Sequence, residues 1–269
     1  MRSIGVSSRS ALTFCRVEHE GPLMVVTLNR PEVLNALHAP AHAELAAVFD
    51  DFAADPAQGV AIVTGAGERS FCVGNDLKHL AGGGSNERPA SGFGGLTFRF
   101  DLDKPIIAAV NGLALGGGFE IALACDLIVA SSSAEFALPE PRVGLAALAG
   151  GVQRLVRQIG SKQALGMLLT GRRVSADEGR VLGFVNEVTA PGDTLSAARR
   201  WAERILECSP HSIRATKQAA ARGLDEPSLP AAMRAQFDYP AVKALFASGD
   251  AIEGPLAFAQ KRPPRWKAG

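Results

Sequence analysis

The sequence predicts an α/β fold with a layered core and a helical C-terminal region. Two observations predict this class. Short apolar runs rich in β-branched residues alternate with helical patterns in the first part of the chain, and helical patterns dominate from Val152 onward. A chain of 269 residues is also long enough to bury a sizeable interior. We therefore expect one core with an extension.

A hairpin is expected at the start of this core. Residues 14–17 and 23–28 predict two strands around a turn at residues 20–22, which contains glycine and proline. Residues 41–54 then carry apolar side chains at helical spacing, and residues 59–65 form a short apolar run rich in β-branched residues. A helix followed by a buried strand is the predicted order.

The same alternation returns later in the chain. Residues 106–110 predict a strand, a helix begins at about Gly117, and residues 127–130 predict another strand. Between these units, residues 81–95 are rich in glycine and have little power to pack. This stretch predicts a mobile loop in a position where it could cover a site.

The C-terminal part of the chain predicts mostly helices. The helical segments are residues 152–159, 162–169, 175–181, 194–207, 210–222 and the tail from Pro230. The apolar face of the tail is larger than one small helical layer would bury alone. We expect an appendage that packs on a partner subunit, and packing on its own core is the alternative. The predicted division is a disordered start (1–13), a core (14–195) and an oligomerisation region (196–269).

Charge and cysteine content disfavour several classes of function. The formal net charge is +1, from 28 basic and 27 acidic residues, so no overall field attracts nucleic acid or an anionic membrane. The four cysteines are widely spaced and form no CxxC pair, so neither a zinc site nor a disulfide framework is indicated. No stretch has the apolar length of a membrane span or the core of a signal peptide. We expect a soluble cytoplasmic protein without a metal, nucleic acid or membrane partner.

Glu120 and Glu140 are the candidate catalytic residues, because each lies in an apolar or glycine-rich setting. A chain seldom keeps two carboxylates beside apolar runs unless they are paired or chemically used. The stretch between them predicts a buried helix and then a strand, which would fold Glu140 back toward Glu120. Two carboxyls in one small volume push their pKa values apart, leaving a proton donor and a base. The alternative is a structural salt bridge, with Arg142 as the partner of Glu140.

Two glycine-containing turns, residues 65–77 and 111–118, follow predicted strands. Glycine lets the backbone approach a ligand closely, and N–H groups in the first turn of a helix have no intrahelical partner. Two such donors that meet at one point make an oxyanion hole. Neither turn fits the dinucleotide-binding or the phosphate-loop pattern. Close helix packing is the alternative role of Gly116-Gly117-Gly118.

Several motifs closely resemble the crotonase (enoyl-CoA hydratase/isomerase) superfamily, in order and spacing, from about residue 14 to the end. They are Leu28-Asn29-Arg30-Pro31, Leu34-Asn35-Ala36-Leu37, residues 71–77 and 110–120, Cys125-Asp126, residues 136–140 and 150–155, and the tail 253–262. The family fold is a spiral of ββα units with a helical C-terminal region that mediates trimers, often paired into hexamers. The resemblance therefore implies a crotonase-like fold and a homotrimer or a dimer of trimers.

The resemblance also implies an acyl-CoA thioester as the substrate, with coenzyme A as part of it and no metal or redox cofactor. The thioester oxygen would lie between the backbone N–H groups of Asn75 and Gly117. Glu120 and Glu140 stand where the hydratases of this family carry their catalytic glutamates. The family roles are activation of water by Glu120 and exchange of the C2 proton by Glu140, or a sharing of both tasks.

For the coenzyme A part, the resemblance places the adenine near one stretch of backbone, with Ala36 at the entrance. The residues of that stretch are Val73, Asn75, Asp76 and Leu77. Lys261 from a neighbouring subunit would meet the 3′-phosphate, with Phe258 against the adenine. Asp126 falls at a family position that we interpret as structural.

The joint presence of both glutamates favours an enoyl-CoA hydratase, which adds water to a trans-2-enoyl-CoA and gives a 3-hydroxyacyl-CoA. Asn75 stands where the family most often has alanine, and residues 145–148 replace a segment containing proline; both departures would reshape the acyl pocket. Leu138, Arg142 and residues 143–145 are closer to carnitinyl-CoA dehydratase-like members. Carnitinyl-CoA dehydration or enoyl-CoA isomerisation is the alternative enzyme activity. A non-catalytic acyl-CoA-binding or RNA-binding relative is the alternative of another class.

Overall fold

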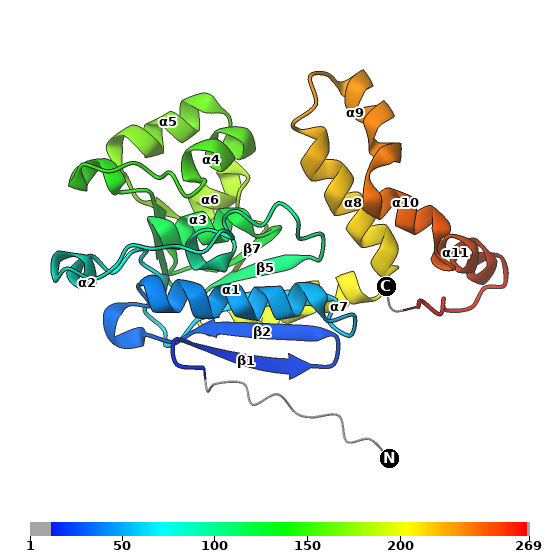
Figure 1. Cartoon of the computed structure of the whole chain (residues 1–269), viewed down its shortest axis with the longest axis horizontal. Helices are drawn as coiled ribbons and strands as arrows, with labels where there is room; N and C mark the ends of the chain where they lie inside the picture. The colour runs from blue at the N-terminus through cyan, green and yellow to red at the C-terminus, as the bar shows by residue number, and fades with distance from the viewer. Residues whose placement is uncertain (1–11, 268–269) are drawn as a thin grey trace, which may run out of the picture.

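The larger of two sheets forms the centre of the molecule (Figure 1). The computed structural model describes residues 12–267, so residues 1–11 of the predicted disordered start lie outside the described part. The sheet has the order β1-β2-β3-β5-β7-β10, and only β1 and β2 pair antiparallel. Its strands are β1 (Cys15–Glu20), β2 (Leu23–Leu28), β3 (Val60–Gly65), β5 (Ile106–Val110), β7 (Leu127–Ser131) and β10 (Glu187–Thr189). The predicted opening hairpin is confirmed.

A second, smaller sheet collects the short strands that follow those of the larger sheet. Its order is β4 (Ser70–Cys72), β6 (Leu113–Leu115), β8 (Glu135–Ala137) and β9 (Val174–Ser175). The chain therefore passes from the larger to the smaller sheet three times, and a helix follows each passage. These helices are α2 (Leu77–Ala81), α3 (Gly117–Ala124) and α4 (Gly151–Ile159). The predicted spiral of ββα units is confirmed.

The alternation of side chains along the strands explains the layers. On β2, Val25 faces α7 (Thr194–Leu206) in one apolar cluster, while Met24 and Val26 face α1 (Ala39–Ala54) in another. A strand with apolar groups on both faces suits a sheet that is covered on both sides. Burial of such a side chain is worth about 1.5–3 kcal/mol, so this centre is the rigid part on which the site is built.

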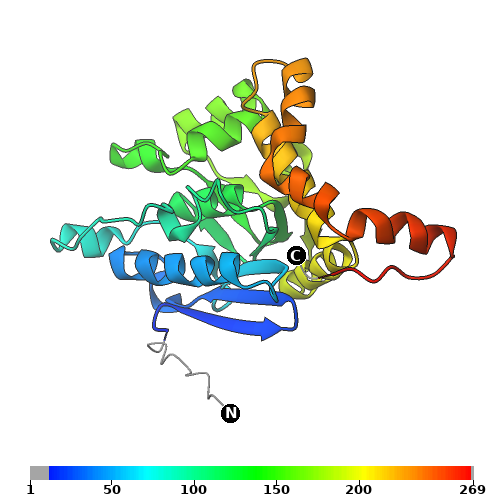
Figure 2. The same cartoon turned by 45° about the vertical axis from the view of Figure 1, so that its right-hand side comes forward.

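The remaining helices extend the fold on two sides. They are α5 (Ser161–Thr170), α6 (Ala176–Leu182), α8 (Pro210–Gly223), α9 (Leu229–Ala235), α10 (Pro240–Ala247) and α11 (Asp250–Ala259), with 3₁₀ turns η1 (Pro31–Val33), η2 (Phe93–Gly95), η3 (Glu140–Val143) and η4 (Gln236–Asp238). Helices α8 to α11 project from the core (Figures 1 and 2). Their large exposed apolar side chains are Leu224, Leu229, Met233, Phe237, Phe246, Ile252, Leu256 and Phe258.

Lys217 connects the projecting helices to the core through hydrogen bonds. Lys217 on α8 donates to the Lys104 carbonyl and to the Asp126 carboxylate, both at 2.8 Å. Asp126 also accepts from the Ile106 N–H at 2.7 Å, which agrees with its interpretation as a structural residue. The alternative of packing on the chain's own core holds for α7, whose Ala197, Ala198 and Ala202 are buried against the sheet, whereas large apolar side chains of α8 to α11 stay exposed within the chain.

Part of the glycine-rich stretch at 81–95 packs more tightly than its composition predicts. Phe93 is only 2% exposed, and a Cβ on Gly95 would lie 2.6 Å from the Ala46 nitrogen of α1. The glycines therefore allow η2 to sit directly on a helix, and the expected lack of packing is wrong for residues 93–95. Among the described residues, no helix is both long and apolar enough to cross a membrane.

Candidate active site

Two backbone turns meet at the start of α3. Gly74, at φ +90°, lies so close to the second turn that a Cβ there would be 2.9 Å from the Gly117 nitrogen. Asn75 pairs with Leu37 in an isolated bridge, flanked by hydrogen bonds of 2.8 Å from Leu37 N–H to the Gly74 carbonyl and from Asp76 N–H to the Leu37 carbonyl. The structure thus brings Asn75 and Gly117, the two predicted oxyanion donors, to one place.

Both donor groups are available to a ligand. Gly117 is the first residue of α3, so its N–H has no partner inside the helix. Within residues 12–267, no protein acceptor is found for the backbone N–H of Asn75 or Gly117. The preceding Gly116, at φ +54°, makes the turn that a residue with a side chain would enter only with strain. The arrangement suits an oxygen that gains negative charge.

Glu120 projects from the first turn of α3 into the interior and is 3% exposed. Its Oε1 accepts a hydrogen bond of 2.9 Å from the Gly151 N–H at the start of α4. The pKa of Glu120 is raised to about 7, first by burial; the Gly151 hydrogen bond lowers it and the charge of Glu140 raises it. A carboxyl with such a pKa can act as a base and as an acid near neutral pH.

Glu140 begins η3 and approaches the same turn from the other side. Its Oε1 lies 3.1 Å from the position that a Cβ on Gly116 would take, while its Oε2 is buried and has no hydrogen-bond partner. Burial raises the pKa of Glu140. Arg142 donates instead to the Thr170 carbonyl at 3.2 Å, so the alternative of a Glu140–Arg142 salt bridge is wrong.

The two glutamates therefore share one volume beside the oxyanion turns. The charge of Glu140 acts on the pKa of Glu120; the Glu140 carboxyl lies against Gly116, and the Glu120 carboxyl lies against Gly151. Burial raises the pKa of both carboxyls, and the charge of Glu140 raises that of Glu120 further, as expected for two carboxyls that interact. Carboxyls of this kind are suited to act as proton donor and base.

Three residues that sequence reasoning did not single out complete the site. The Phe93 ring lies against Gly117, because a Cβ on that glycine would be 2.5 Å from the ring. His42 accepts from the Gly94 N–H at 3.1 Å and contacts the Phe93 ring edge-on, with a centroid distance of 4.4 Å. Burial lowers the pKa of His42 to about 4, so it stays a neutral acceptor. Gly151 was noted only as part of a motif, and no sequence signal linked it to Glu120.

The predicted coenzyme A residues fall into two groups. One group lies along the turn beside the oxyanion donors and consists of Ala36, Val73, Asn75, Asp76 and Leu77. The Asp76 carboxylate is occupied, because it caps α2 and pairs with Arg30 at 3.0 Å. Phe258 and Lys261 lie on and just after α11, on the opposite side of the molecule from α2 (Figures 1 and 2). One chain alone does not bring the two groups together.

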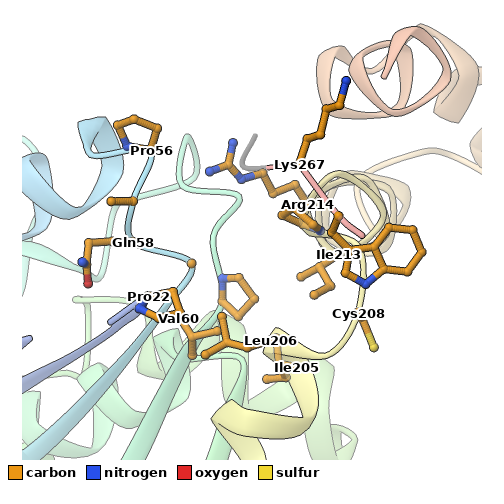
Figure 3. Close-up of a pocket in the computed structure, with 15 residues that line it drawn as sticks. Pro22, Pro56, Gln58, Val60, Ile205, Leu206, Cys208, Ile213, Arg214 and Lys267 are labelled. Atoms are coloured by element: carbon orange, nitrogen blue, oxygen red, sulfur yellow. The ribbon is translucent and has the colours of Figure 1, made fainter. Parts of the chain in front are cut away.

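A separate hollow lies where the core meets the C-terminal helices (Figure 3). It has a volume of about 270 Å³ and is lined mainly by apolar side chains such as Pro22, Ile205 and Trp266, with Arg214 and Lys267 also at its wall. None of the predicted site residues lines it. Within the described part of the chain, no group of three or more potential metal ligands is found. The carboxyl pair therefore remains the candidate for chemistry.

Known proteins resemble this chain over almost its whole length. A carnitinyl-CoA dehydratase of Proteus mirabilis is 43% identical over 254 residues, which cover 92% of this chain and 95% of the relative. The carnitinyl-CoA dehydratase of Escherichia coli K12 is also 43% identical over 254 residues, with the same coverage.

Solved structures agree with the sequence relatives. An enoyl-CoA hydratase of Mycobacterium marinum has a TM-score of 0.89 and 40% identity, over 95% of this chain and 99% of that chain. A carnitinyl-CoA dehydratase of Mycobacterium avium has a TM-score of 0.76 and 41% identity, over 96% of this chain and 100% of that chain. The enoyl-CoA hydratase/isomerase profile matches residues 18–269, and the chain therefore belongs to the enoyl-CoA hydratase/isomerase family.

Proposed function

We propose that the chain is an enoyl-CoA hydratase, a hydro-lyase that adds water reversibly to a trans-2-enoyl-CoA and gives a 3-hydroxyacyl-CoA. One observation supports this most. The Glu140 carboxyl lies against Gly116, the residue before Gly117, and its charge acts on Glu120, while the backbone N–H groups of Asn75 and Gly117 have no protein acceptor within the described residues. Hydration of a thioester needs such a set, because charge develops on the thioester oxygen while water loses a proton and C2 gains one.

The steps follow from the positions of these groups. The Glu120 carboxylate takes a proton from water as the water oxygen bonds to C3. The π electrons of the C2–C3 bond move toward the thioester oxygen, where each of the two N–H donors is worth about 3 kcal/mol. Protonated Glu140 then gives its proton to C2, and the thioester carbonyl returns. Glu120 ends protonated and Glu140 ionised, and a proton passes back from Glu120 to Glu140 to complete the cycle.

The pKa shifts suit both directions of the reaction. Burial and the charge of Glu140 raise the pKa of Glu120 to about 7, and burial raises that of Glu140. Glu120 can therefore give or take a proton near neutral pH, and the raised pKa of Glu140 favours its protonated form. Enolate stabilisation by backbone donors and proton transfer by carboxyls requires no metal or redox cofactor, so coenzyme A enters only as part of the substrate. Carnitinyl-CoA dehydration is the second candidate, favoured by the names of curated relatives that are 43% identical to this chain.

The proposal extends to assembly and location. The exposed apolar side chains of α8 to α11, with Phe258 88% exposed, support a homotrimer or a dimer of trimers. In such an assembly Lys261 would reach the coenzyme A 3′-phosphate of a neighbouring subunit. The described cysteines are all unpaired, and three of them are buried, which supports a reducing cytoplasm.

Crotonyl-CoA tests the proposed reaction. Purified protein should remove the absorbance of the conjugated thioester, and the product should be 3-hydroxybutyryl-CoA by mass spectrometry. The matched variants Glu120→Gln and Glu140→Gln should lose most of this activity, because each removes a proton-transfer group and keeps the side-chain shape. No absorbance change at high enzyme concentration would contradict the proposal. Salt-dependent RNA binding by a protein without this activity would support the non-enzymatic alternative.

A further inference from the structure

Arg88 places an unpaired cation at the site. Its guanidinium carbon lies 5.3 Å from the centroid of the Phe93 ring, and that ring lies against Gly117, one of the two oxyanion donors. Within residues 12–267, no carboxylate pairs with Arg88 and no hydrogen bond holds its guanidinium. An arginine on an aromatic face keeps its N–H groups free at the edge of the plane, where they can meet an anion.

The segment that carries Arg88 is fixed to the oxyanion turn. The Asn75 side-chain amide donates to the Asn86 side-chain oxygen at 2.9 Å, two residues before Arg88. On the other side, Phe93 is 2% exposed and its N–H donates to Thr97. Arg88 is therefore held between two contacts with the site. Its charge lowers the pKa of Glu120 and of His42, which agrees with a position near both groups.

A second guanidinium, that of Arg154, also interacts with Glu120. Arg154 is on α4, one turn after Gly151, and donates to the Thr97 carbonyl at 2.9 Å. Its guanidinium carbon lies 5.5 Å from the centroid of the Phe100 ring. The charge of Glu120 opposes the lowering of the Arg154 pKa by burial, so the two groups interact. Two guanidinium groups, those of Arg88 and Arg154, therefore act on Glu120.

The positive charges of Arg88 and Arg154 indicate which charge on an acyl group this site favours. A quaternary ammonium needs an aromatic cage or a carboxylate partner. Here the Phe93 and Phe100 rings already carry guanidinium groups, and the carboxyls at hand are the two that transfer protons. A carboxylate on the acyl chain would instead meet the free N–H groups of Arg88 in the fork geometry that arginine presents.

We propose that the preferred substrate is an enoyl-CoA whose acyl chain ends in a carboxylate, and that Arg88 binds this carboxylate. The proposal rests on the hydratase function proposed above and deepens it. It also separates the chain from its carnitinyl-CoA relatives, because the carnitinyl group carries a trimethylammonium cation that Arg88 and Arg154 repel.

Three substrates of similar shape test the charge preference. Glutaconyl-CoA and crotonobetainyl-CoA carry a carboxylate and a trimethylammonium group at the same distance from the double bond, and crotonyl-CoA is neutral. We expect kcat/KM to be at least about tenfold higher for glutaconyl-CoA than for crotonobetainyl-CoA, as a charge-assisted hydrogen bond would produce. An equal or higher kcat/KM for crotonobetainyl-CoA would overturn the proposal.

Variants of Arg88 assign the effect to one side chain. Arg88→Gln should lower the ratio of kcat/KM for glutaconyl-CoA over crotonyl-CoA about tenfold, Arg88→Lys should keep part of it, and Arg88→Glu should shift the preference toward crotonobetainyl-CoA. Lys162→Gln removes one positive charge from the exposed face of α5 and should keep the wild-type ratio. If Arg88→Gln lowers kcat/KM equally for all three substrates, Arg88 binds the common coenzyme A part and the proposal is wrong.

A binding measurement separates this proposal from the proposed reaction. Dissociation constants of the saturated glutaryl-CoA, butyryl-CoA and butyrobetainyl-CoA need no turnover. Glutaryl-CoA should bind about tenfold more tightly than butyrobetainyl-CoA in the wild type, and Arg88→Gln should remove this difference. Charge preference without hydration would contradict only the proposed reaction. Hydration of crotonyl-CoA with no charge preference would contradict only the role of Arg88.

Discussion

The structure holds the carboxyl groups of Glu120 and Glu140 in different ways. Glu120 comes from a buried helix, is 3% exposed and is fixed by the Gly151 N–H. Glu140 comes from a 3₁₀ turn next to exposed residues, and its buried Oε2 has no hydrogen-bond partner. The fixed Glu120 carboxyl suits the proposed activation of water at one place. The unpaired oxygen of Glu140 suits the proposed transfer of a proton to C2.

Removal of either carboxyl is expected to have the largest effect. Glu120→Gln and Glu140→Gln should each lower kcat for crotonyl-CoA hydration about 10²- to 10⁴-fold, because each transfers a proton in the reaction. Steady-state kinetics measure this, and circular dichroism checks that the variants stay folded. If one variant keeps a kcat near that of the wild type, the carboxyl removed in that variant takes no part in the reaction.

The stability of the protein should report how strongly Glu120 is buried. Its pKa rises from 4.5 to about 7 on folding, so between these values the folded protein binds more protons than the unfolded chain. Stability is therefore lost as pH rises through this window, by about 3 kcal/mol in total.

Glu120→Gln should therefore be more stable than the wild type at pH 8 and equal to it below about pH 4.5. Urea denaturation at several pH values measures the difference. Glu140→Gln is the matched comparison and should gain less, because Glu140 is only half-buried. A pH-independent difference between Glu120→Gln and the wild type would contradict the raised pKa.

The pH dependence of hydration should follow the ionisation of Glu120. Glu120 must be ionised to accept a proton from water, so kcat/KM should fall about tenfold per unit as pH drops below about 7. The residual activity of Glu120→Gln should not show this acidic limb, whereas residual activity of Glu140→Gln should keep it. Measurement of kcat/KM against pH for the wild type and the two variants tests this. If Glu140→Gln lost the acidic limb and Glu120→Gln kept it, the roles of the two glutamates would be exchanged.

A substitution at Gly116 tests how much the activity depends on the position of the Glu140 carboxyl. A Cβ at this position would lie 3.1 Å from Glu140 Oε1, so Gly116→Ala should displace the carboxyl by a few tenths of an ångström and lower kcat about tenfold. Gly144→Ala is the control, because Gly144 also has a positive φ, of +73°, but nothing lies within 4 Å of its added Cβ. Equal losses in both variants would point to backbone strain instead of a displaced Glu140.

Much of this site could be predicted from the sequence. The convergence of Glu120 and Glu140 follows from a buried helix and strand between them, and the structure confirms it. The placement of Asn75 beside Gly117 came from the family resemblance, because each turn taken alone is a weak signal. Their roles remain predictions that the experiments test, and the boundaries at residues 13 and 195 also remain predictions.

Other features of the structure could not be predicted from any pattern in the sequence. The strands of the smaller sheet are two or three residues long, too short for a hydrophobic period to show. The packing of Phe93 on Gly117 depends on residues more than twenty positions apart, so local propensity says nothing about it. Proximity in sequence makes Arg142 the natural partner of Glu140, but its guanidinium donates to the Thr170 carbonyl.

A double-mutant cycle in crotonyl-CoA hydration tests the central claim most directly. If Glu120 and Glu140 act as one unit on one bound thioester, the double Gln variant should be about as slow as the slower single variant. The result that contradicts the account is a double variant whose loss equals the product of the two single losses, or a double variant that still hydrates crotonyl-CoA at the wild-type rate.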